Sequence, residues 1–219
     1  MRHLVHASGR RSKISGLCVA LLLAAGIIAE RAAAAAITTG PQDSVRGFYA
    51  NLLATMKDGR TLGQSGRYAR LAPVVDRVFD VPAMTRLAIG SSWATLPAAR
   101  QQQLMEAFRH YIAATYADRF DSYSGEQLQV TGEQPYNADV IVQTKIVKSD
   151  GEPTTLNYLM RQNQGSWQIS DVYLDGSISQ LAVQRSEFNS ILRREGVDGL
   201  VMALNRKVDL LSHGVAKAS

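Results

Sequence analysis

The amino-acid sequence predicts an α+β fold in which helices cover one side of a four-stranded antiparallel sheet. Three observations lead to this fold class. Apolar residues recur every three to four positions before residue 121, alternate with polar residues between 127 and 174, and return to the helical spacing after 177. Helices followed by a run of strands and then by helices favour α+β over an alternating α/β arrangement.

The first helix is expected over residues 42–57, where six apolar side chains fall at helical spacing. A lysine in its last turn and Gly59 just after it provide the stop signal. Gly63 and Gly66 then indicate a loop, because glycine weakens a helix interior. A short helix around 74–79 is expected to follow.

Two more helices precede the strands. The first runs from 82 to 89 and is closed by Gly90. The second is the longest expected, and Thr95-Leu96-Pro97 opens it, because proline is tolerated in the first turn of a helix. One stripe along this helix carries apolar and aromatic side chains, from Leu104 to Phe120.

The alternating region predicts a four-stranded meander. The strands are expected at 127–131, 140–146, 156–160 and 167–174. The polar, glycine-containing segments 149–152 and 163–165 are hairpin signals. Short turns of this kind join antiparallel neighbours, so the strand order follows the chain.

After the fourth strand, Ser177 and Gln180 match a capping box, S-x-x-Q, which predicts a helix start. Leu181, Phe188 and other apolar residues lie on one face of this helix. Gly196 is expected to break it, and a last helix follows over 197–211.

The first 36 residues are typical of a cleaved signal peptide. Basic residues at positions 10, 11 and 13 precede a mostly apolar stretch, 14–28, and the alanine run 32–36 offers a cleavage site after Ala36. The stretch is short for a spanning helix, which needs about 20 apolar residues. We therefore expect export, with 37–219 as a single domain that lacks cysteine, because Cys18 is the only one in the chain.

The net charge of +5 is concentrated in this leader. Five of the 24 Lys and Arg residues and one of the 19 Asp and Glu residues precede position 37, which leaves 19 basic and 18 acidic residues, a net charge of +1. A domain that binds nucleic acid normally carries a strong basic excess. The charge balance therefore argues against a nucleic-acid partner.

Motifs for catalysis or metal binding are absent from the sequence. It has no G-x-S-x-G, no H-E-x-x-H and no P-loop. After residue 36 only His110 and His213 remain and no cysteine does, so a His/Cys metal cluster cannot form. A carboxylate-only calcium site around Asp171 and Asp175 lacks EF-hand spacing. We expect neither a metal nor a cofactor.

Asp171 and His110 are the candidate acid–base residues of the sequence. By alternation, Asp171 shares a strand face with apolar residues, where a carboxyl group with a raised pKa serves as a general base. The favoured interpretation is structural: Asp171 pairs with an arginine or caps backbone groups near the following helix start. His110 is interpreted as a surface residue or one satisfied by hydrogen bonds.

Several segments resemble the MlaC/toluene-tolerance family of exported lipid carriers. The run 167–177, with the later Arg185, Phe188 and Gly196, is similar to that family's W-x-I-x-D-V-x-x-x-G-x-S strand–turn–helix. Positions in the middle helices and the third strand also resemble it: Phe79-Asp80, Met84, Gly90, Trp93, Phe108 and Tyr158-Leu159. Within the family, the segments 56–59, 66–68 and 71–73 look closest to the hopanoid-associated branch called HpnM.

This resemblance implies an NTF2-like/MlaC-like fold whose curved sheet and helices enclose an apolar cavity for one lipid, a hopanoid or a phospholipid. It implies a periplasmic carrier that exchanges lipid with an inner-membrane ABC-type transport complex and with an outer-membrane lipoprotein complex or transporter. Combined with the apolar periodicity, it predicts these lipid-binding residues: Phe79, Met84, Leu87, Phe108, Tyr111, Ile112, Tyr116, Tyr158, Trp167 and Ile169.

Two alternatives remain open at this point. A cavity enzyme of the NTF2-like type would use Asp171, His110 and a tyrosine such as Tyr111. An adaptor that binds partner proteins would have a solid core and no ligand. Periodicity cannot separate these from a carrier, because a filled core and the wall of a cavity need the same apolar spacing.

Overall fold

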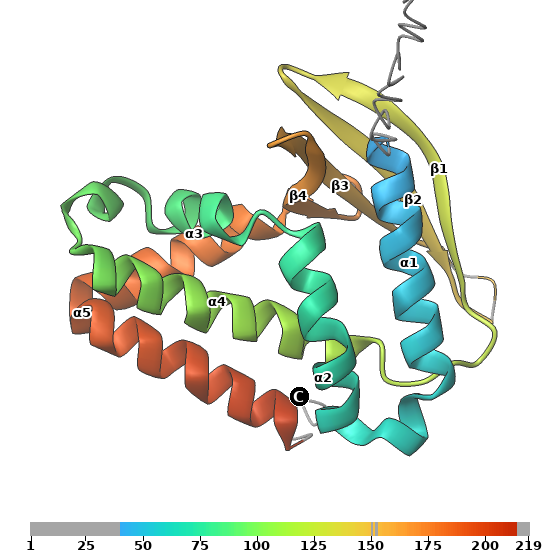
Figure 1. Cartoon of the computed structure of the whole chain (residues 1–219), viewed down its shortest axis with the longest axis horizontal. Coiled ribbons are helices and arrows are strands. Elements are labelled where there is room, and N and C mark those ends of the chain that lie inside the picture. The colour runs from blue at the N-terminus through green and yellow to red at the C-terminus, as the bar shows by residue number, and fades with distance from the viewer. Residues whose placement is uncertain (1–39, 150, 152, 214–219) are drawn as a thin grey trace, which may run out of the picture. The chain divides into compact units, whose positions relative to one another are not determined.

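The computed structural model describes residues 40–149, 151 and 153–213, all of which lie within one compact unit, Ile37–Ser219. The predicted signal peptide, 1–36, lies outside the described residues. Within them, helices and strands follow one another as predicted for an α+β fold: helices, an antiparallel sheet, then helices (Figure 1).

The helices agree with the sequence pattern except at one loop. They are α1 (Pro41–Lys57), α2 (Gly59–Val78), α3 (Val81–Ile89), the 3-10 helix η1 (Gly90–Thr95), α4 (Ala98–Arg119) and α5 (Gln180–Ser212). The interruption predicted around Gly63 and Gly66 is present at Gly63 only, where φ 60° and ψ −177° are non-helical and kink α2. Gly66 lies inside the helix, so no longer loop forms there.

The C-terminal helix begins two residues later than predicted. Ser179, not Ser177, is the N-cap of α5, and its hydroxyl accepts a hydrogen bond from the Ala182 N–H. Gly196 interrupts α5 at φ 68°, as predicted, and divides it into two arms. Because of that interruption α4 is the longest unbroken helix.

The sheet is an antiparallel meander with strand order β1-β2-β3-β4-β5. Its strands are β1 (Gln127–Tyr136), β2 (Asp139–Val147), β3 (Pro153–Asn163), β4 (Ser166–Leu174) and β5 (Ile178–Ser179). The four predicted strands are present, and the two-residue β5 adds a fifth that is too short to show alternation. Gln164 and Gly165, both with positive φ, form the tight β3–β4 turn.

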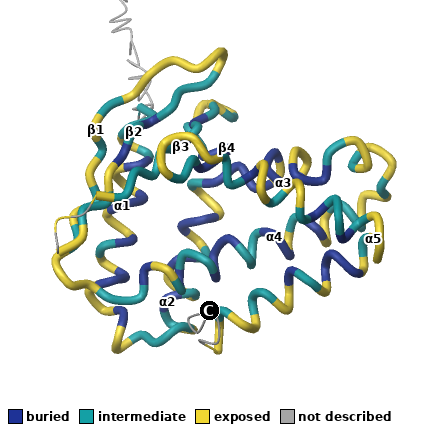
Figure 2. The backbone as a smooth tube through the Cα atoms, turned by 180° about the vertical axis from the view of Figure 1, so that it is seen from behind, coloured by how far each residue is buried: buried dark blue, intermediate teal, exposed yellow. Residues whose placement is uncertain are grey.

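Helix α1 lies across one face of the sheet, whereas α3, α4 and α5 extend away from it (Figure 1). Helix α1 packs on β1, β2 and β4, whereas α4 makes its main contacts with α5, α2 and α3 (Figure 1). Buried residues follow the inner sides of α1, α2 and α4 and the strands beneath them, and the loops at the edges are exposed (Figure 2). The middle of the core is aromatic, with Phe48, Phe79 and Tyr158 almost fully buried.

The junction between α2 and α3 is attached directly to the sheet. Phe79 forms an isolated parallel bridge with Ile169 of β4, and the Asp80 N–H donates to the Ile169 carbonyl at 2.9 Å. The Asp80 carboxylate accepts a bond from the Ala83 N–H, which caps α3, and one from Asn163. Helices α2 and α3 and strand β4 therefore meet at Phe79 and Asp80.

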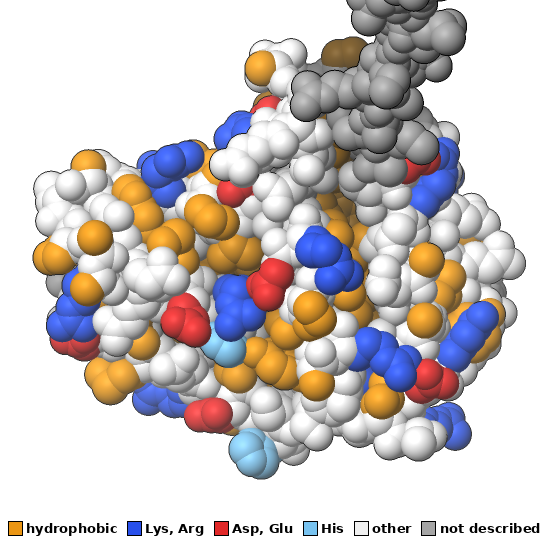
Figure 3. Space-filling model, in the orientation of Figure 1, with side chains coloured by type: hydrophobic (Ala, Val, Ile, Leu, Met, Phe, Trp, Pro, Cys, Tyr) orange, Lys and Arg blue, Asp and Glu red, His pale blue; other side chains and the backbone are white. Residues whose placement is uncertain are grey.

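The surface of the described residues carries both signs of charge. Basic and acidic side chains are interspersed between apolar patches on the face drawn in Figure 3. Among the described residues, no helix combines the length and the apolar character that crossing a membrane requires.

Gly59 lies where α2 begins beside the C-terminal end of α4. A Cβ atom built there would overlap the backbone carbonyl oxygen of Asp121. Arg67, which is 8% exposed, ties the same region together by donating to the carbonyls of Gly59 and Ala117. This close approach requires a residue without a side chain.

We predict that Gly59→Ala destabilises the protein by about 1–3 kcal/mol, because the added methyl group meets backbone that can only move as a unit. The matched control is Gly47→Ala in the exposed part of α1, where a Cβ atom has nothing within 4 Å. That change should stabilise the protein by about 0.5–1 kcal/mol. Urea unfolding measures both, and equal effects of the two substitutions would contradict the packing argument.

Candidate functional site

A cavity of about 240 Å³ lies between α4, the first arm of α5 and the inward face of the sheet. Twelve of its 18 lining residues are apolar or aromatic. Helix α4 contributes four of these twelve, and Phe120, its C-cap, contributes a fifth. The strands contribute Ile146, Leu156, Val172 and Leu174. The cavity exists because α4 packs on the neighbouring helices and leaves space above the sheet.

Six of the ten residues predicted to bind lipid line this cavity. They are Phe79, Met84, Phe108, Tyr111, Ile112 and Tyr116. The other four lie elsewhere. Tyr158 and Ile169 are fully buried in the solid part of the core, Trp167 is partly buried nearer the start of β4, and Leu87 is 43% exposed on α3.

Twelve lining residues were not in the predicted set: Thr115, Arg119, Phe120, Ile146, Thr154, Leu156, Asp171, Val172, Leu174, Gln180, Leu181 and Gln184. Phe120 belongs to the apolar stripe predicted on the long helix, and Leu181 belongs to the apolar face predicted for the helix after the strands. Ile146 and Leu156 are apolar residues of two predicted strands. A signal for these four was therefore present in the periodicity. The polar residues Arg119 and Gln184 carried no such signal.

A β-bulge explains the missed residues on β4. Leu159 pairs with Asp171 and Met160 pairs with Ile169, so Ser170 is the extra residue. The bulge shifts the alternation by one, and Val172 and Leu174 take the inward positions after it. Simple alternation from Ile169 would have assigned those positions to Asp171 and Tyr173.

Stacked aromatic rings form the back wall of the cavity. Tyr116 stacks on Phe120 with ring centroids 5.6 Å apart, and it also contacts Phe79 at 5.5 Å. Phe48 packs edge-on against Tyr116 and Phe79 from the core side. Rings fixed on several sides hold the wall in place, since such pairs add about 0.5–1.5 kcal/mol each beyond the area they bury.

Asp171 has a structural role at the start of α5. One carboxylate oxygen accepts bonds from the N–H groups of Val172 and Leu181, at 2.7 and 3.0 Å, and the other accepts a bond from the Ser179 hydroxyl at 2.6 Å. The carboxylate thus caps backbone groups at the helix start, which is the structural interpretation that the sequence favoured.

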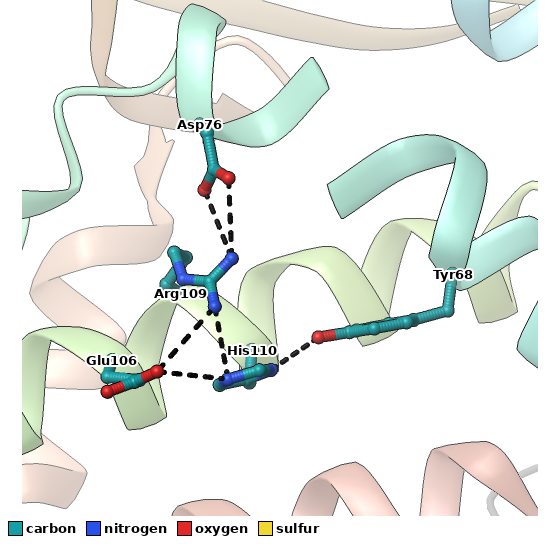
Figure 4. Close-up of polar contacts among 5 residues, drawn as sticks. All are labelled: Tyr68, Asp76, Glu106, Arg109 and His110. Carbon is teal, nitrogen blue, oxygen red and sulfur yellow. Dashed lines mark hydrogen bonds and ion pairs between the residues drawn. The ribbon is translucent and has the colours of Figure 1, made fainter. Parts of the chain in front are cut away.

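His110 lies outside the cavity, in a polar cluster between α2 and α4 (Figure 4). Its Nδ1 is hydrogen-bonded to the Tyr68 hydroxyl, and Arg109 donates to its Nε2 at 3.1 Å. Because arginine is always a donor, Nε2 accepts and the proton of the neutral ring resides on Nδ1. Arg109 also reaches Asp76 on α2 at 3.3 Å.

This cluster links two helices at the surface. The side chains of Arg109 and Asp76 are 30% and 45% exposed, and exposed ion pairs contribute about 0–1 kcal/mol. The structure therefore separates the two groups considered for an enzyme, with Asp171 in the cavity wall and His110 in this cluster. No group of three or more His, Cys, Asp or Glu residues within the described parts of the chain is arranged to hold a metal ion.

Three tyrosines lie together in the core behind the cavity. Burial raises the pKa of Tyr49, Tyr116 and Tyr158 above the ordinary value of 10.0. The Tyr49 hydroxyl is bonded to Thr144 Oγ1 at 2.6 Å, whereas the Tyr158 hydroxyl has no hydrogen-bond partner in the part of the chain that the structure describes. All three remain neutral at physiological pH.

Comparison with known proteins adds two findings. A family model described as MlaC protein matches residues 47–206. Among solved structures, a phospholipid-binding protein from Ralstonia solanacearum, determined in complex with a phospholipid, is similar to this chain with a TM-score of 0.67. The sequences are 24% identical, and the match covers 80% of this chain and 99% of that one, so the two share a fold.

We predict that stability falls as the pH rises above about 10, because the tyrosines then ionise in the unfolded chain and not in the folded one. Each raised pKa contributes about 1.4 kcal/mol per pH unit until its folded value is reached. Tyr116→Phe removes one contribution, so its free energy of unfolding should fall less steeply between pH 10 and 11 than that of the wild type.

Urea unfolding at several pH values measures these slopes, and differences between variants cancel the titration of the lysines. Tyr136→Phe, at a side chain that is 46% exposed, is the control and should keep the wild-type slope. Identical slopes for the wild type and Tyr116→Phe would show that this ring is not shielded from water.

Proposed function

We propose that this chain, which belongs to the MlaC family, is a carrier that binds one membrane lipid and moves it between membranes. One observation carries the proposal: the chain has a cavity whose lining is two-thirds apolar or aromatic, between α4 and the sheet. The Ralstonia solanacearum protein with the same fold is described as phospholipid-binding, which supports a lipid as the occupant.

The energetics of an acyl chain suit such a cavity. Exposing a chain of about 16 carbons to water costs about 12 kcal/mol, at ~0.8 kcal/mol for each CH₂ group. A carrier must supply comparable apolar contact. The cavity of about 240 Å³ is below the range of about 300–1,000 Å³ in which drug-sized ligands bind. A two-chain lipid would therefore extend through the mouth or displace part of the wall.

The proposed setting is the periplasm, with an inner-membrane ABC-type complex and an outer-membrane lipoprotein complex as exchange partners. The cargo is a phospholipid or a hopanoid. Transfer of this kind needs no chemical step, which is consistent with Asp171 being engaged by three donors at the start of α5. The protein's part is to shield apolar chains from water between two docking events.

The proposal predicts that the purified, exported protein carries about one lipid for each chain. Organic extraction followed by mass spectrometry identifies the lipid, and uptake of labelled lipid from vesicles measures loading of the emptied protein. Absence of both extracted lipid and uptake would overturn the carrier proposal and favour an adaptor with a solid core.

Filling the cavity should block loading. We predict that Leu156→Trp lowers lipid uptake several-fold, because the larger side chain occupies space facing the partly buried Leu156. Its melting temperature should change little, whereas the same change in a solid core costs about 1–3 kcal/mol. Leu87→Trp is the control: this exposed residue lies outside the cavity, so uptake should stay at the wild-type level.

A destabilised Leu156→Trp protein that still loads lipid normally would contradict the assignment of this cavity. If the protein were an adaptor with a solid core, Leu156→Trp would lower its stability, and neither the wild type nor the variant would take up lipid.

A further inference from the structure

The cavity wall contains a polar atom that the protein leaves without a partner. Gln184, in the second turn of α5, lines the cavity, and its Oε1 is buried with no hydrogen-bond partner in the described part of the chain. A buried acceptor in this state costs about 1–3 kcal/mol, and an apolar residue of similar shape would avoid that cost. A donor on a bound molecule would satisfy Oε1.

A cation lies at the opening of the same cavity. Arg119, in the last turn of α4, lines the cavity and is exposed, so it lies where the cavity meets solvent. Arg109 and Arg161 pair with carboxylates, but Arg119 forms no ion pair within the described residues. Its guanidinium group is free to bind an anion, and phosphate suits its planar fork of donors.

Asp171 also lines the cavity and restricts which ligand groups can bind beside Gln184. Its oxygens already accept three hydrogen bonds, and its negative charge disfavours a second anion deep in the cavity. The surroundings of Gln184 therefore favour a neutral or cationic donor, such as a hydroxyl or an ammonium group. The two groups without a partner therefore favour different parts of a ligand. The Arg119 guanidinium favours an anion, and the Gln184 carboxamide oxygen favours a hydrogen-bond donor.

From this arrangement we propose that Arg119 at the mouth of the cavity and Gln184 in its wall form a head-group subsite for glycerophospholipids whose head group carries a hydrogen-bond donor. Arg119 binds the phosphate. The Gln184 carboxamide oxygen accepts a hydrogen bond from the hydroxyl or ammonium group that a short carbon chain joins to that phosphate. The inference rests on the proposed carrier function and specifies its cargo. Lipids that lack either the phosphate or the donor bind less tightly.

Three lipids with the same acyl chains separate the two contacts. Phosphatidylethanolamine has a phosphate and a donor, phosphatidylcholine has a phosphate and no donor, and diacylglycerol has a hydroxyl donor and no phosphate. The emptied, exported protein is incubated with vesicles that contain each lipid, and bound lipid is quantified. The wild type should prefer phosphatidylethanolamine to each of the others by about fivefold to tenfold, the effect of one hydrogen bond to a charged or polar group.

Each variant should abolish one preference and keep the other. Gln184→Leu should bind phosphatidylethanolamine and phosphatidylcholine equally, and Arg119→Gln should bind phosphatidylethanolamine and diacylglycerol equally. Gln103→Leu is the control for the carboxamide, because Gln103 is exposed on α4 and lies outside the cavity. Arg193→Gln, at an exposed position of α5, is the control for charge. Both controls should keep the wild-type preferences.

A second readout guards against a folding artefact. Gln184→Leu removes an unpaired buried acceptor, so the lipid-free variant should melt at the same temperature as the wild type or higher. Phosphatidylglycerol, which offers hydroxyl donors, should behave like phosphatidylethanolamine, and a response to only one of them would identify the donor as the hydroxyl or the ammonium group.

Equal uptake of all three lipids by the wild type would overturn the subsite and leave the carrier proposal standing. Variants that lose all three lipids in equal proportion would also overturn it, since that result indicates damage to the cavity. No uptake of any lipid would overturn the carrier proposal itself, together with the inference built on it.

Discussion

The arrangement of this protein depends on the attachment of the α2–α3 junction to β4. The bridge between Phe79 and Ile169 and the bond from the Asp80 N–H to the Ile169 carbonyl fix two helices to the sheet at one point. The Phe79 ring then contacts Phe48 on the core side and Tyr116 on the cavity side. Because α4 packs on α2 and α3, the same attachment determines how far α4 stands from the strands.

The inward face of the sheet is divided between a solid core and an open cavity. Val142, Tyr158 and Ile169 are fully buried, whereas Ile146 and Leu156 face empty space further along the same strands. An apolar occupant that binds only the folded chain would cover this apolar lining and stabilise the protein.

The sequence predicted the α+β fold and one third of the cavity lining from the spacing of apolar residues, and it missed the other lining residues for different reasons. Spacing reveals which face of an element is apolar, and this located the helices, the four long strands and cavity residues such as Phe108 and Ile112. It does not reveal where along that face the neighbouring element makes contact, so Tyr158 and Leu156 could not be distinguished. It is also blind to the bulge at Ser170, which reassigns Val172, and to the positive φ that lets Gly63 kink α2.

A carrier must release its cargo as well as hold it, and this limits how strong the cavity contacts can be. Apolar burial in a bilayer and in a cavity is of similar strength, so acyl contacts alone give transfer no direction. The described surface also mixes both signs of charge (Figure 3), and residues 37–219 carry a net charge of +1, which gives little attraction to an anionic membrane. Under the carrier proposal, direction must therefore come from docking partners or from energy spent elsewhere. Under the same proposal, a partner at the membrane can reach Arg119 first, because this lining residue is exposed. Competition for the head group there would loosen the lipid before its chains leave the cavity.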